Sequence, residues 1–421
     1  MTHSAGSRVL LVLMLLTTVA VTACNDSVTP VTPDVVSPPS ANAVSQAAPG
    51  WTVVSTPNPS TSSDDLYAAR ALSATDVWAV GSKGSSTGSE TLAEHMTGTS
   101  WSVASTPNPG GSNQCGNGNV LFDVAASSAT NVWAVGYYYS CSLLKPLAMK
   151  WNGSQWTVYS TPIPGTSGNN ILNGVAVTST GDWWAVGYYE ANNGAPTPLI
   201  MRSRGTSWAQ VTGATVPGAT SNVLNTVAVA GPNDIWAAGT YYDPPTGLTE
   251  TMVQHWNGST WSIVPSPSPG NYLANVINQL VAVSPTDVWA FGYYDDNVTG
   301  RVTLIEHWNG SAWSIVPSPN GSVSYFSANE LNGAVALSAN DIWAVGHWRS
   351  DGTNQEKQTM TLHWDGSSWT LLPSPTRGMA SNLNSIATTG GGLWAVGETS
   401  QYGNDRYTGA FIVPRTLAMK R

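Results

Sequence analysis

Charged residues are scarce in this chain: Lys, Arg, Asp and Glu make up 9% of its 421 residues, against about a quarter in an average soluble protein. The 15 basic residues are outnumbered by 24 acidic ones, the net charge is −9, and the basic residues form no cluster. A protein that grips a phosphate backbone needs a basic patch. We therefore expect no nucleic-acid partner.

A helical hydrophobic period is also missing from the chain after its N-terminal segment. The apolar run Val9–Leu16 is too short to span a bilayer as a helix. Cysteine is rare, with three in the chain, whereas 41 Gly, 27 Pro and 20 Trp are present. The sequence therefore favours short strands joined by turns.

Seven copies of one phrase organise the chain: a turn residue, an aliphatic residue, Trp, Ala, a small apolar residue and Gly. The phrase is clear in Asp76–Gly81, and its tryptophans lie 51 to 55 residues apart, at Trp78, Trp133, Trp184, Trp236, Trp289, Trp343 and Trp394. A fixed period of about this length is typical of a repeat architecture. A second phrase runs in step with it, clearest as Trp256–Pro267, and contributes Trp101, Trp156, Trp208, Trp261, Trp313 and Trp369.

Each repeat divides into four short segments rich in Val, Ile, Trp and Tyr, which predict strands. Asn309-Gly310 is a strong hairpin signal, because both central residues of a type I′ turn need positive φ. Four antiparallel strands repeated around an axis make a β-propeller blade. We therefore predict an all-β fold, a seven-bladed β-propeller of four-stranded antiparallel blades.

The partial repeats predict how the ring closes. The last repeat lacks its fourth strand, and an orphan copy of that strand, Trp51–Thr56, stands before the first repeat. We expect the orphan to be the outer strand of blade seven. The predicted divisions are residues 1–23 as a signal peptide, 24–50 as a Pro/Ser/Thr-rich tether, 51–414 as the propeller and 415–421 as a tail.

The N-terminus resembles a bacterial lipoprotein leader. Arg8 precedes the apolar run, and Val21-Thr22-Ala23 precedes Cys24, as in a lipobox. The resemblance implies that Cys24 is acylated and holds the protein on the outer face of a bacterial membrane, which it contacts through this anchor only. The alternative is an ordinary signal peptide in which Cys24 falls at the cleavage point by chance.

The other cysteines are Cys115, in the loop that enters blade two, and Cys141, between the second and third strands of that blade. Both loop classes emerge on the same face of a propeller. In an exported protein this favours a disulfide between them. The alternative is two free thiols.

This face carries the longer loops, and binding residues concentrate on loops held by a scaffold. The ligand-binding candidates include aromatic residues that follow the repeat glycine: Tyr138, Tyr189, Tyr242, Tyr294 and Trp348. A second group starts the innermost strands: Asn173, Asn225, Asn278, Asn332 and Asn384. Alternatively, the aromatic side chains pack against adjacent blades and the asparagines hydrogen-bond backbone.

Most residues with catalytic chemistry belong to the repeat itself. His95, His255, His307 and His363 share one position in different blades, so they form no common metal site, and we expect no cofactor. Asp76 and its equivalents Asp182, Asp234, Asp287 and Asp341 are expected to cap their own turns. Asp64-Asp65 reads as a solvated loop pair, and Asp295-Asp296-Asn297 lacks the spacing of an EF-hand calcium loop.

Residues 51–414 resemble the seven-bladed propellers of the kelch/galactose-oxidase and sialidase-like groups, and repeat-bearing bacterial surface lipoproteins. The Asn-Gly-Ser-x-Trp hairpin, as in Asn257–Trp261, is similar in position to the sialidase Asp-box but is one residue shorter. The sialidase arginine triad, the kelch Gly-Gly pair and the galactose-oxidase copper ligands have no counterpart; Arg70 is a loose match to one arginine. The resemblance therefore implies the fold and no catalytic residue.

Two classes of function fit these observations. The first is a membrane-anchored, monomeric, non-enzymatic module that binds a glycan or a surface protein. The second is an extracellular carbohydrate-active enzyme, a sialidase-like hydrolase or lyase, with its site at the loop-side channel mouth. Paired carboxylates at that mouth would favour the enzyme. A purely structural scaffold is the third alternative.

Overall fold

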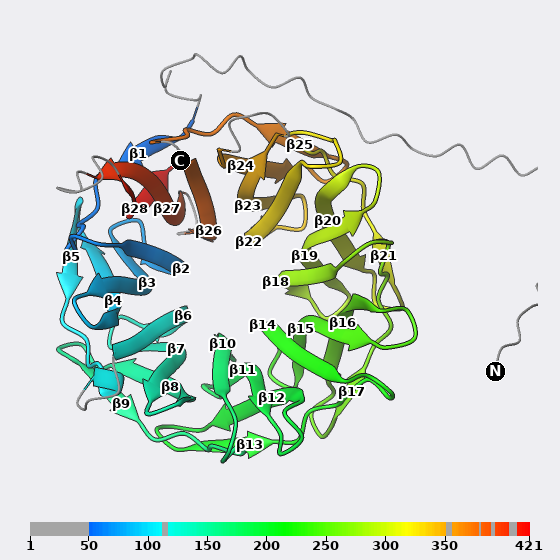
Figure 1. Cartoon of the computed structure of the whole chain (residues 1–421), viewed down its shortest axis with the longest axis horizontal. Coiled ribbons are helices and arrows are strands. Elements are labelled where there is room, and N and C mark those ends of the chain that lie inside the picture. Colours follow the sequence, from blue (N-terminus) through cyan, green and yellow to red (C-terminus); the bar gives the residue numbers. More distant parts are fainter. Residues whose placement is uncertain (1–49, 112–116, 351–355, 379, 389–391, 404–410) are drawn as a thin grey trace, which may run out of the picture. The chain divides into compact units, whose positions relative to one another are not determined.

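A computed structural model describes residues 50–111, 117–350, 356–378, 380–388, 392–403 and 411–421, all within one compact unit of the chain. Their strands form five hydrogen-bonded sheets: three have four strands, and two have eight, each made of two neighbouring four-stranded antiparallel units joined by a short parallel pairing. The seven four-stranded units are arranged as a ring, with the strand that precedes each first-phrase Trp strand innermost (Figure 1). The predicted seven-bladed propeller is confirmed. Within the described residues, no helix has the length and apolar character needed to cross a bilayer.

The blades follow one another in chain order. Blade 1 comprises β2 (Asp64–Ser73), β3 (Asp76–Ser85), β4 (Gly88–Thr97) and β5 (Ser100–Ala104), and a 3-10 turn, η1 (Pro109–Gly111), follows it. Blade 2 comprises β6 (Asn117–Ser128), β7 (Asn131–Ser140), β8 (Leu143–Trp151) and β9 (Trp156–Tyr159). Blade 3 comprises β10 (Asn170–Val177), β11 (Trp183–Glu190), β12 (Pro196–Ser203) and β13 (Trp208–Val211). Blade 4 comprises β14 (Ser221–Gly231), β15 (Asp234–Asp243), β16 (Leu248–Trp256) and β17 (Trp261–Ile263).

The remaining blades repeat the pattern. Blade 5 comprises β18 (Asn275–Ser284), β19 (Asp287–Asp296), β20 (Gly300–Trp308) and β21 (Trp313–Ile315). Blade 6 comprises β22 (Ala328–Ser338), β23 (Asp341–Arg349), β24 (Gln358–Trp364) and β25 (Trp369–Leu372). Blade 7 comprises β26 (Ala380–Thr388), β27 (Leu393–Gly403), β28 (Phe411–Lys420) and, from the N-terminal side, β1 (Thr52–Val54).

The orphan strand closes the ring as predicted. Strand β1 pairs antiparallel with the end of β28, with Thr52 opposite Lys420 (Figure 1). This pairing corrects the C-terminal boundary of the propeller. Residues 415–420 lie in β28, and Arg421 exchanges backbone hydrogen bonds with Leu393, so no tail begins at 415. The sequence does not mark the end of β28, because this strand has no Trp phrase of its own.

The two Trp phrases meet between the blades. At every interface, the Trp of one blade's second strand lies edge-on to the outer-strand Trp of the next blade, with ring centroids 5.2 to 6.2 Å apart and interplanar angles of 76 to 89°. Trp51 fills this place for the last interface, against Trp343. Seven hydrophobic clusters, one for each interface, surround these pairs. Edge-to-face aromatic pairs add about 1 kcal/mol each beyond the burial of their surface.

The Ser/Pro stretch after each outer strand also has a structural role. In blades 1, 4, 5 and 6, a threonine of the third strand bonds a hydroxyl 15 residues later, at 2.7 to 2.8 Å. Blade 7 makes the same contact between Thr416 and Thr56, across the two ends of the chain. In these five blades the stretch is therefore tied to the third strand along the outside of the blade.

Candidate functional site

The predicted aromatic candidates do not form one exposed ring. Trp348 is buried in the interface between blades 5 and 6, where Gly321 lies against its indole. Tyr138 and Tyr189 are half-buried against interface clusters, and Tyr294 is half-buried as well. Tyr242 alone of the five is classed as exposed, at 40%. The packing alternative therefore describes Trp348 and, more loosely, Tyr138 and Tyr189, and Tyr242 is the most exposed of the five candidates.

The five asparagines link neighbouring blades. Each occupies a β-bulge of its inner strand and donates its side-chain Nδ2–H to a backbone carbonyl of the next blade, at 2.8 to 3.0 Å. The acceptors are, in order, Leu224, Ile277, Leu331, Leu383 and Leu66. Their side-chain amides therefore donate hydrogen bonds to the backbone of the neighbouring blade, and not to the backbone of the loops.

The repeated histidines and aspartates form a second set of structural contacts. In four blades the His Nε2 lies 2.8 to 3.0 Å from the Oδ1 of the turn Asp, and the imidazole stacks on the repeat Trp at 3.9 to 4.3 Å. Asp182 instead pairs with Arg202 and Arg204. We expected these aspartates to cap their own turns; their carboxylates instead bind His or Arg side chains of the third strand or of the residues just after it.

Departures from the repeat gather at one part of the ring. Two residues before the bulge, blades 2 to 5 carry Val120, Ile171, Val223 and Val276, whereas blades 6, 7 and 1 carry Glu330, Asn382 and Asp65. The residues paired with these three are His347, Glu398 and Ser82. Blades 6, 7 and 1 are consecutive around the ring, so a polar sector lies on this side of the channel mouth. This sector could have been found in the sequence, because one position of the repeat changes from an aliphatic to a polar residue.

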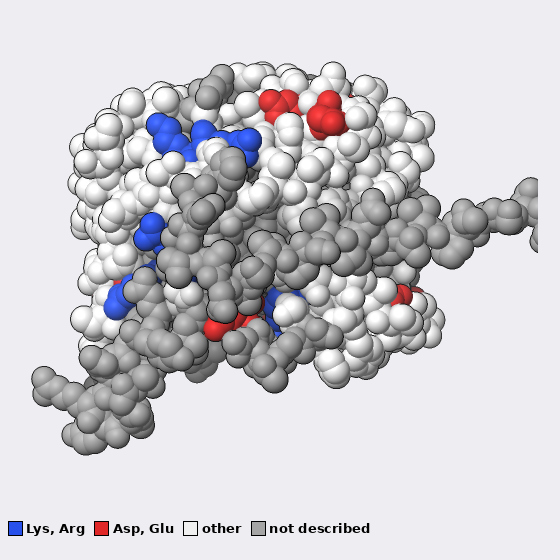
Figure 2. Space-filling view, turned by 90° about the horizontal axis from the view of Figure 1, so that it is seen from above, with Lys and Arg blue, Asp and Glu red and all other residues white. Residues whose placement is uncertain are grey.

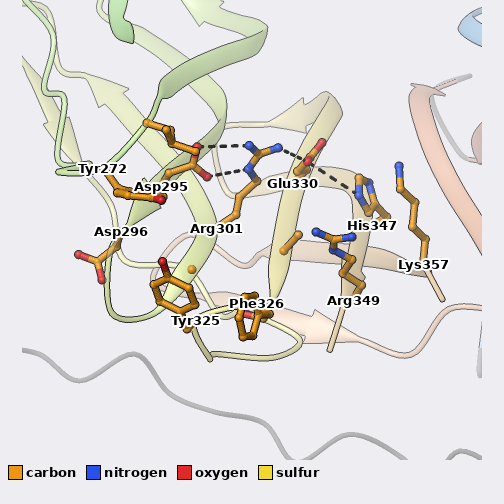
Figure 3. Close-up of a pocket in the computed structure, with 14 residues that line it drawn as sticks. Tyr272, Asp295, Asp296, Arg301, Tyr325, Phe326, Glu330, His347, Arg349 and Lys357 are labelled. Carbon is orange, nitrogen blue, oxygen red and sulfur yellow. Dashed lines mark hydrogen bonds and ion pairs between the residues drawn. The ribbon is translucent and has the colours of Figure 1, made fainter. Parts of the chain in front are cut away.

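Next to this sector, a pocket of about 510 Å³ opens between blades 5 and 6. Its floor is built around Arg301 at the start of β20 (Figure 3). The Arg301 guanidinium binds Asp295 through Nε and Nη2 at 2.8 and 3.2 Å, and Glu330 through Nη1 at 2.5 Å. It also lies 3.9 Å from the ring centroid of Tyr293. These contacts hold the guanidinium in one place and join the two blades.

The electrostatics of the floor keep Glu330 charged. Burial opposes its ionisation, but the nearby positive charges of His347, when it is protonated at acidic pH, and of Arg301 and Lys357 outweigh burial and lower the pKa of Glu330. Burial lowers the pKa of His347 to about 4, although Glu330 acts in the opposite direction. His347 is therefore neutral near pH 7, and its Nδ1 lies 3.0 Å from the Oδ1 of Asn382 in the polar sector.

The rim of the pocket is apolar and exposed. Tyr272, Leu273, Tyr325 and Phe326 are 46, 58, 51 and 63% exposed. Tyr325 and Phe326 meet edge-on at 4.9 Å on a turn closed by Ser327, whose backbone N–H and Oγ both donate to the Ser324 carbonyl. A hydrogen-bonded turn thus presents two large aromatic side chains to water. Sequence reasoning missed this rim because its residues lie in loops outside the repeat.

The acidic pair Asp64-Asp65 is not a solvated loop pair. Both residues are buried in β2, where Asp64 accepts hydrogen bonds from the Ser60 N–H and from Arg415. Burial and a hydrogen bond with Glu398 raise the pKa of Asp65 to about 8. Asp65 is therefore held as a neutral acid at pH 7, close to Glu398 in the polar sector.

The two carboxylates of the loop Asp295-Asp296-Asn297 already accept hydrogen bonds from neighbouring residues. Asp295 binds Arg301, while Asp296 accepts the N–H groups of Val298 and Thr299. Across the part of the chain that the structure describes, no group of three or more His, Cys, Asp or Glu side chains is placed to hold a metal ion. These aspartates thus serve to shape the β19–β20 hairpin and the pocket.

The cysteine predictions fall partly outside the described residues. Cys141 occupies the β7–β8 turn with a φ of +47°. Cys24 and Cys115 lie outside the described ranges, so the acylation of Cys24 and the disulfide between Cys115 and Cys141 stay predictions.

The chain was compared with known families, curated proteins and solved structures. No family model matches it, and no curated protein matches it in sequence. A structure of YCF48 bound to D1 peptide aligns at 12% identity with a TM-score of 0.50, over 88% of this chain and 96% of the other. The Hadza microbial sialidase Hz136 aligns at 12% identity and a TM-score of 0.44, over 74% and 66% of the two chains. Trypanosoma rangeli sialidase in complex with sialic acid aligns at 12% identity and 0.43, over 89% and 59%.

These neighbours are β-propellers, and at such identities the likeness concerns the fold alone. The structural neighbours include both binding proteins and carbohydrate-active enzymes. The choice between those functions therefore depends on the residues of this chain.

Proposed function

We propose that this propeller is a non-enzymatic binding module that holds a glycan or protein ligand in the pocket between blades 5 and 6. One observation carries the proposal: exposed aromatic side chains and residues that depart from the repeat converge on one pocket of the loop face. A concave site with apolar walls and a few fixed polar groups is the usual form of a ligand site. Tyr325 and Phe326 are exposed and belong to none of the interface clusters, and we assign ligand contact to them.

The polar floor supports the same function. Arg301 is fixed by Asp295, Glu330 and the Tyr293 ring, so its orientation requires little further ordering when a ligand binds. Large aromatic side chains commonly dominate the binding energy of a site. YCF48 with its peptide and a sialidase with sialic acid illustrate the two ligand classes on this fold.

Replacing Tyr325 and Phe326 by Ala together tests the proposal. We expect binding on a glycan array or a peptide array to fall by more than about tenfold. The melting temperature should stay unchanged, because both side chains lie outside the blade interfaces. The matched control is Tyr242→Ala, which removes an exposed aromatic of the same face that does not line the pocket. A loss of binding in the control but not in the double variant would move the site to blade 4 and overturn the proposal.

We place the module outside the cytoplasm, held on the outer face of a bacterial membrane by acylated Cys24. The sparse charge seen over the side of the molecule in Figure 2 is compatible with an extracytoplasmic surface. Cys24→Ala should release the protein from the membrane fraction or block its processing. Unchanged membrane association of this variant would remove the lipid anchor from the proposal.

A further inference from the structure

Two exposed aliphatic side chains, Leu273 and Val298, stand beside the aromatic rings of the pocket rim. Leu273, Phe326 and Val298, which lies on the neighbouring β19–β20 hairpin, are 58, 63 and 71% exposed and have no polar side-chain atom. A sugar ring stacks on a flat aromatic face and needs hydrogen-bond partners around its edge. Aliphatic side chains provide neither. Aliphatic side chains instead pack against the apolar side chains of a protein ligand. The burial is favourable by about 25 cal/mol for each Å² of apolar surface removed from water.

The acidic groups of the pocket are already bound within the protein. Asp295 and Glu330 share Arg301, and Asp296 accepts bonds from its own hairpin and from Asn271. They therefore offer little attraction to a cationic ligand.

The opposite end of the pocket is basic. Arg349 and Lys357 lie there, beside His347 and away from Tyr272 (Figure 3). Among the described residues, no acid forms an ion pair with the Lys357 ammonium within 4.0 Å. Electrostatic complementarity at this end favours a carboxylate.

From these two features, and resting on the proposed function, we infer that the ligand is a segment of a partner protein in which apolar side chains adjoin an acidic residue. The apolar side chains pack on Leu273, Tyr325 and Phe326. The carboxylate meets Lys357 at the blade-6 end of the pocket. Tyr272 stands at the other end and bounds the apolar part of the site.

Random peptides displayed on phage test this inference with the purified full-length chain as bait. We expect enrichment of peptides in which Asp or Glu neighbours large apolar residues. Enrichment should vanish with the Leu273→Ser/Phe326→Ser double variant, whose melting temperature should equal that of the wild type. An enriched peptide is then synthesised in two forms, with its acidic residue and with the matching amide.

Lys357→Gln should weaken binding of the acidic form by about tenfold or more and leave the amide form unchanged. Lys145→Gln is the matched control, since Lys145 lies near the start of the third strand of blade 2, as Lys357 directly precedes the third strand of blade 6. Enriched peptides without acidic residues, or equal effects of Lys357→Gln on both forms, would overturn the carboxylate contact.

The outcome also separates this inference from the proposed function. If no peptide is enriched but glycan binding depends on Tyr325 and Phe326, the pocket is a ligand site and the peptide inference is wrong. If neither library shows binding that depends on these residues, both are wrong.

Discussion

Glu306 lies in the third strand of blade 5 with no exposed surface, and neither of its carboxyl oxygens has a hydrogen-bond partner in the described structure. Glu94 holds the same position in blade 1. Blade 4 has Gln254 there, and its amide bonds both the N–H and the carbonyl of Ala214 at 2.9 and 2.8 Å. Burial raises the pKa of Glu306 to about 8 and that of Glu94 to about 9. Both glutamates are therefore neutral acids at pH 7, in a position that also accepts a neutral amide.

The stability contributed by Glu306 should fall as pH rises. Its pKa is about 8 in the folded state, against an ordinary value of 4.5, so the folded state retains a proton that the unfolded state releases. This contribution is complete below pH 4.5 and is lost as pH rises through 8. We expect Glu306→Gln to reduce the fall in unfolding free energy between pH 5 and 9 by on the order of 3 kcal/mol, measured by chemical denaturation.

Glu90→Gln is the control for this experiment, because Glu90 lies in β4, is partly exposed and pairs with Lys83. Its pH profile should follow that of the wild type. If the Glu306→Gln profile also follows the wild type, the buried glutamate is not a neutral acid.

At the scale of the strand, two repeated contacts hold blade to blade: the edge-on Trp pairs and the asparagine bonds. The asparagine series is interrupted in blades 1 and 2, where Tyr67 and Phe122 occupy the bulge and meet at 5.7 Å. In blade 2 the next residue, Asp123, accepts the backbone N–H of Val175 in blade 3 at 2.8 Å. Burial raises the pKa of Asp123 to about 7 even though this bond favours its charged form. Each interface near the channel thus has its own polar or aromatic link.

Removing one asparagine should loosen one interface. Asn278→Ala deletes the 3.0 Å bond to the Leu331 carbonyl between blades 5 and 6. We expect a loss of about 1 kcal/mol in unfolding free energy, the usual net value of such a bond. Gln155→Ala, which removes an exposed amide from a hairpin, should cost less than about 0.5 kcal/mol. Equal losses in the two variants would mean that the bulge asparagines do not stabilise the ring.

The strands and their order could be predicted because the same strand pattern recurs in seven repeats of the sequence. Trp78 and its equivalents locate each second strand, and the orphan Trp51 locates the closing strand. The buried role of Asp64 could not be predicted, since it depends on Arg415, which lies 351 residues away in sequence. The pocket could not be predicted for the same reason. Tyr272 and Phe326 belong to separate loops, which come together only through the packing of blades 5 and 6.

For the molecule as a whole, stability depends on closing the ring. Blade 7 takes three strands from the C-terminal end and β1 from the N-terminal side, and Thr56 then bonds Thr416 at 2.7 Å. Trp51 is 1% exposed and belongs to the cluster between blades 6 and 7. Without β1, the third strand of blade 7 would present an unpaired edge, and Trp343 would lose its edge-on partner.

A chain that begins at Ser60 should therefore be far less stable than one that begins at Ala48, with a lower melting temperature or with aggregation. The point variant Trp51→Ala isolates the packing contribution from that of the strand. It should reduce the unfolding free energy by about 3 to 5 kcal/mol, as for other buried large aromatics. Trp256→Ala provides the comparison, because Trp256 is buried in another interface and makes no contact with the closing strand. If the ring closes through β1, Trp51→Ala should cost at least as much as Trp256→Ala. Equal melting temperatures for the chains beginning at Ser60 and Ala48 would show that blade 7 is stable with three strands.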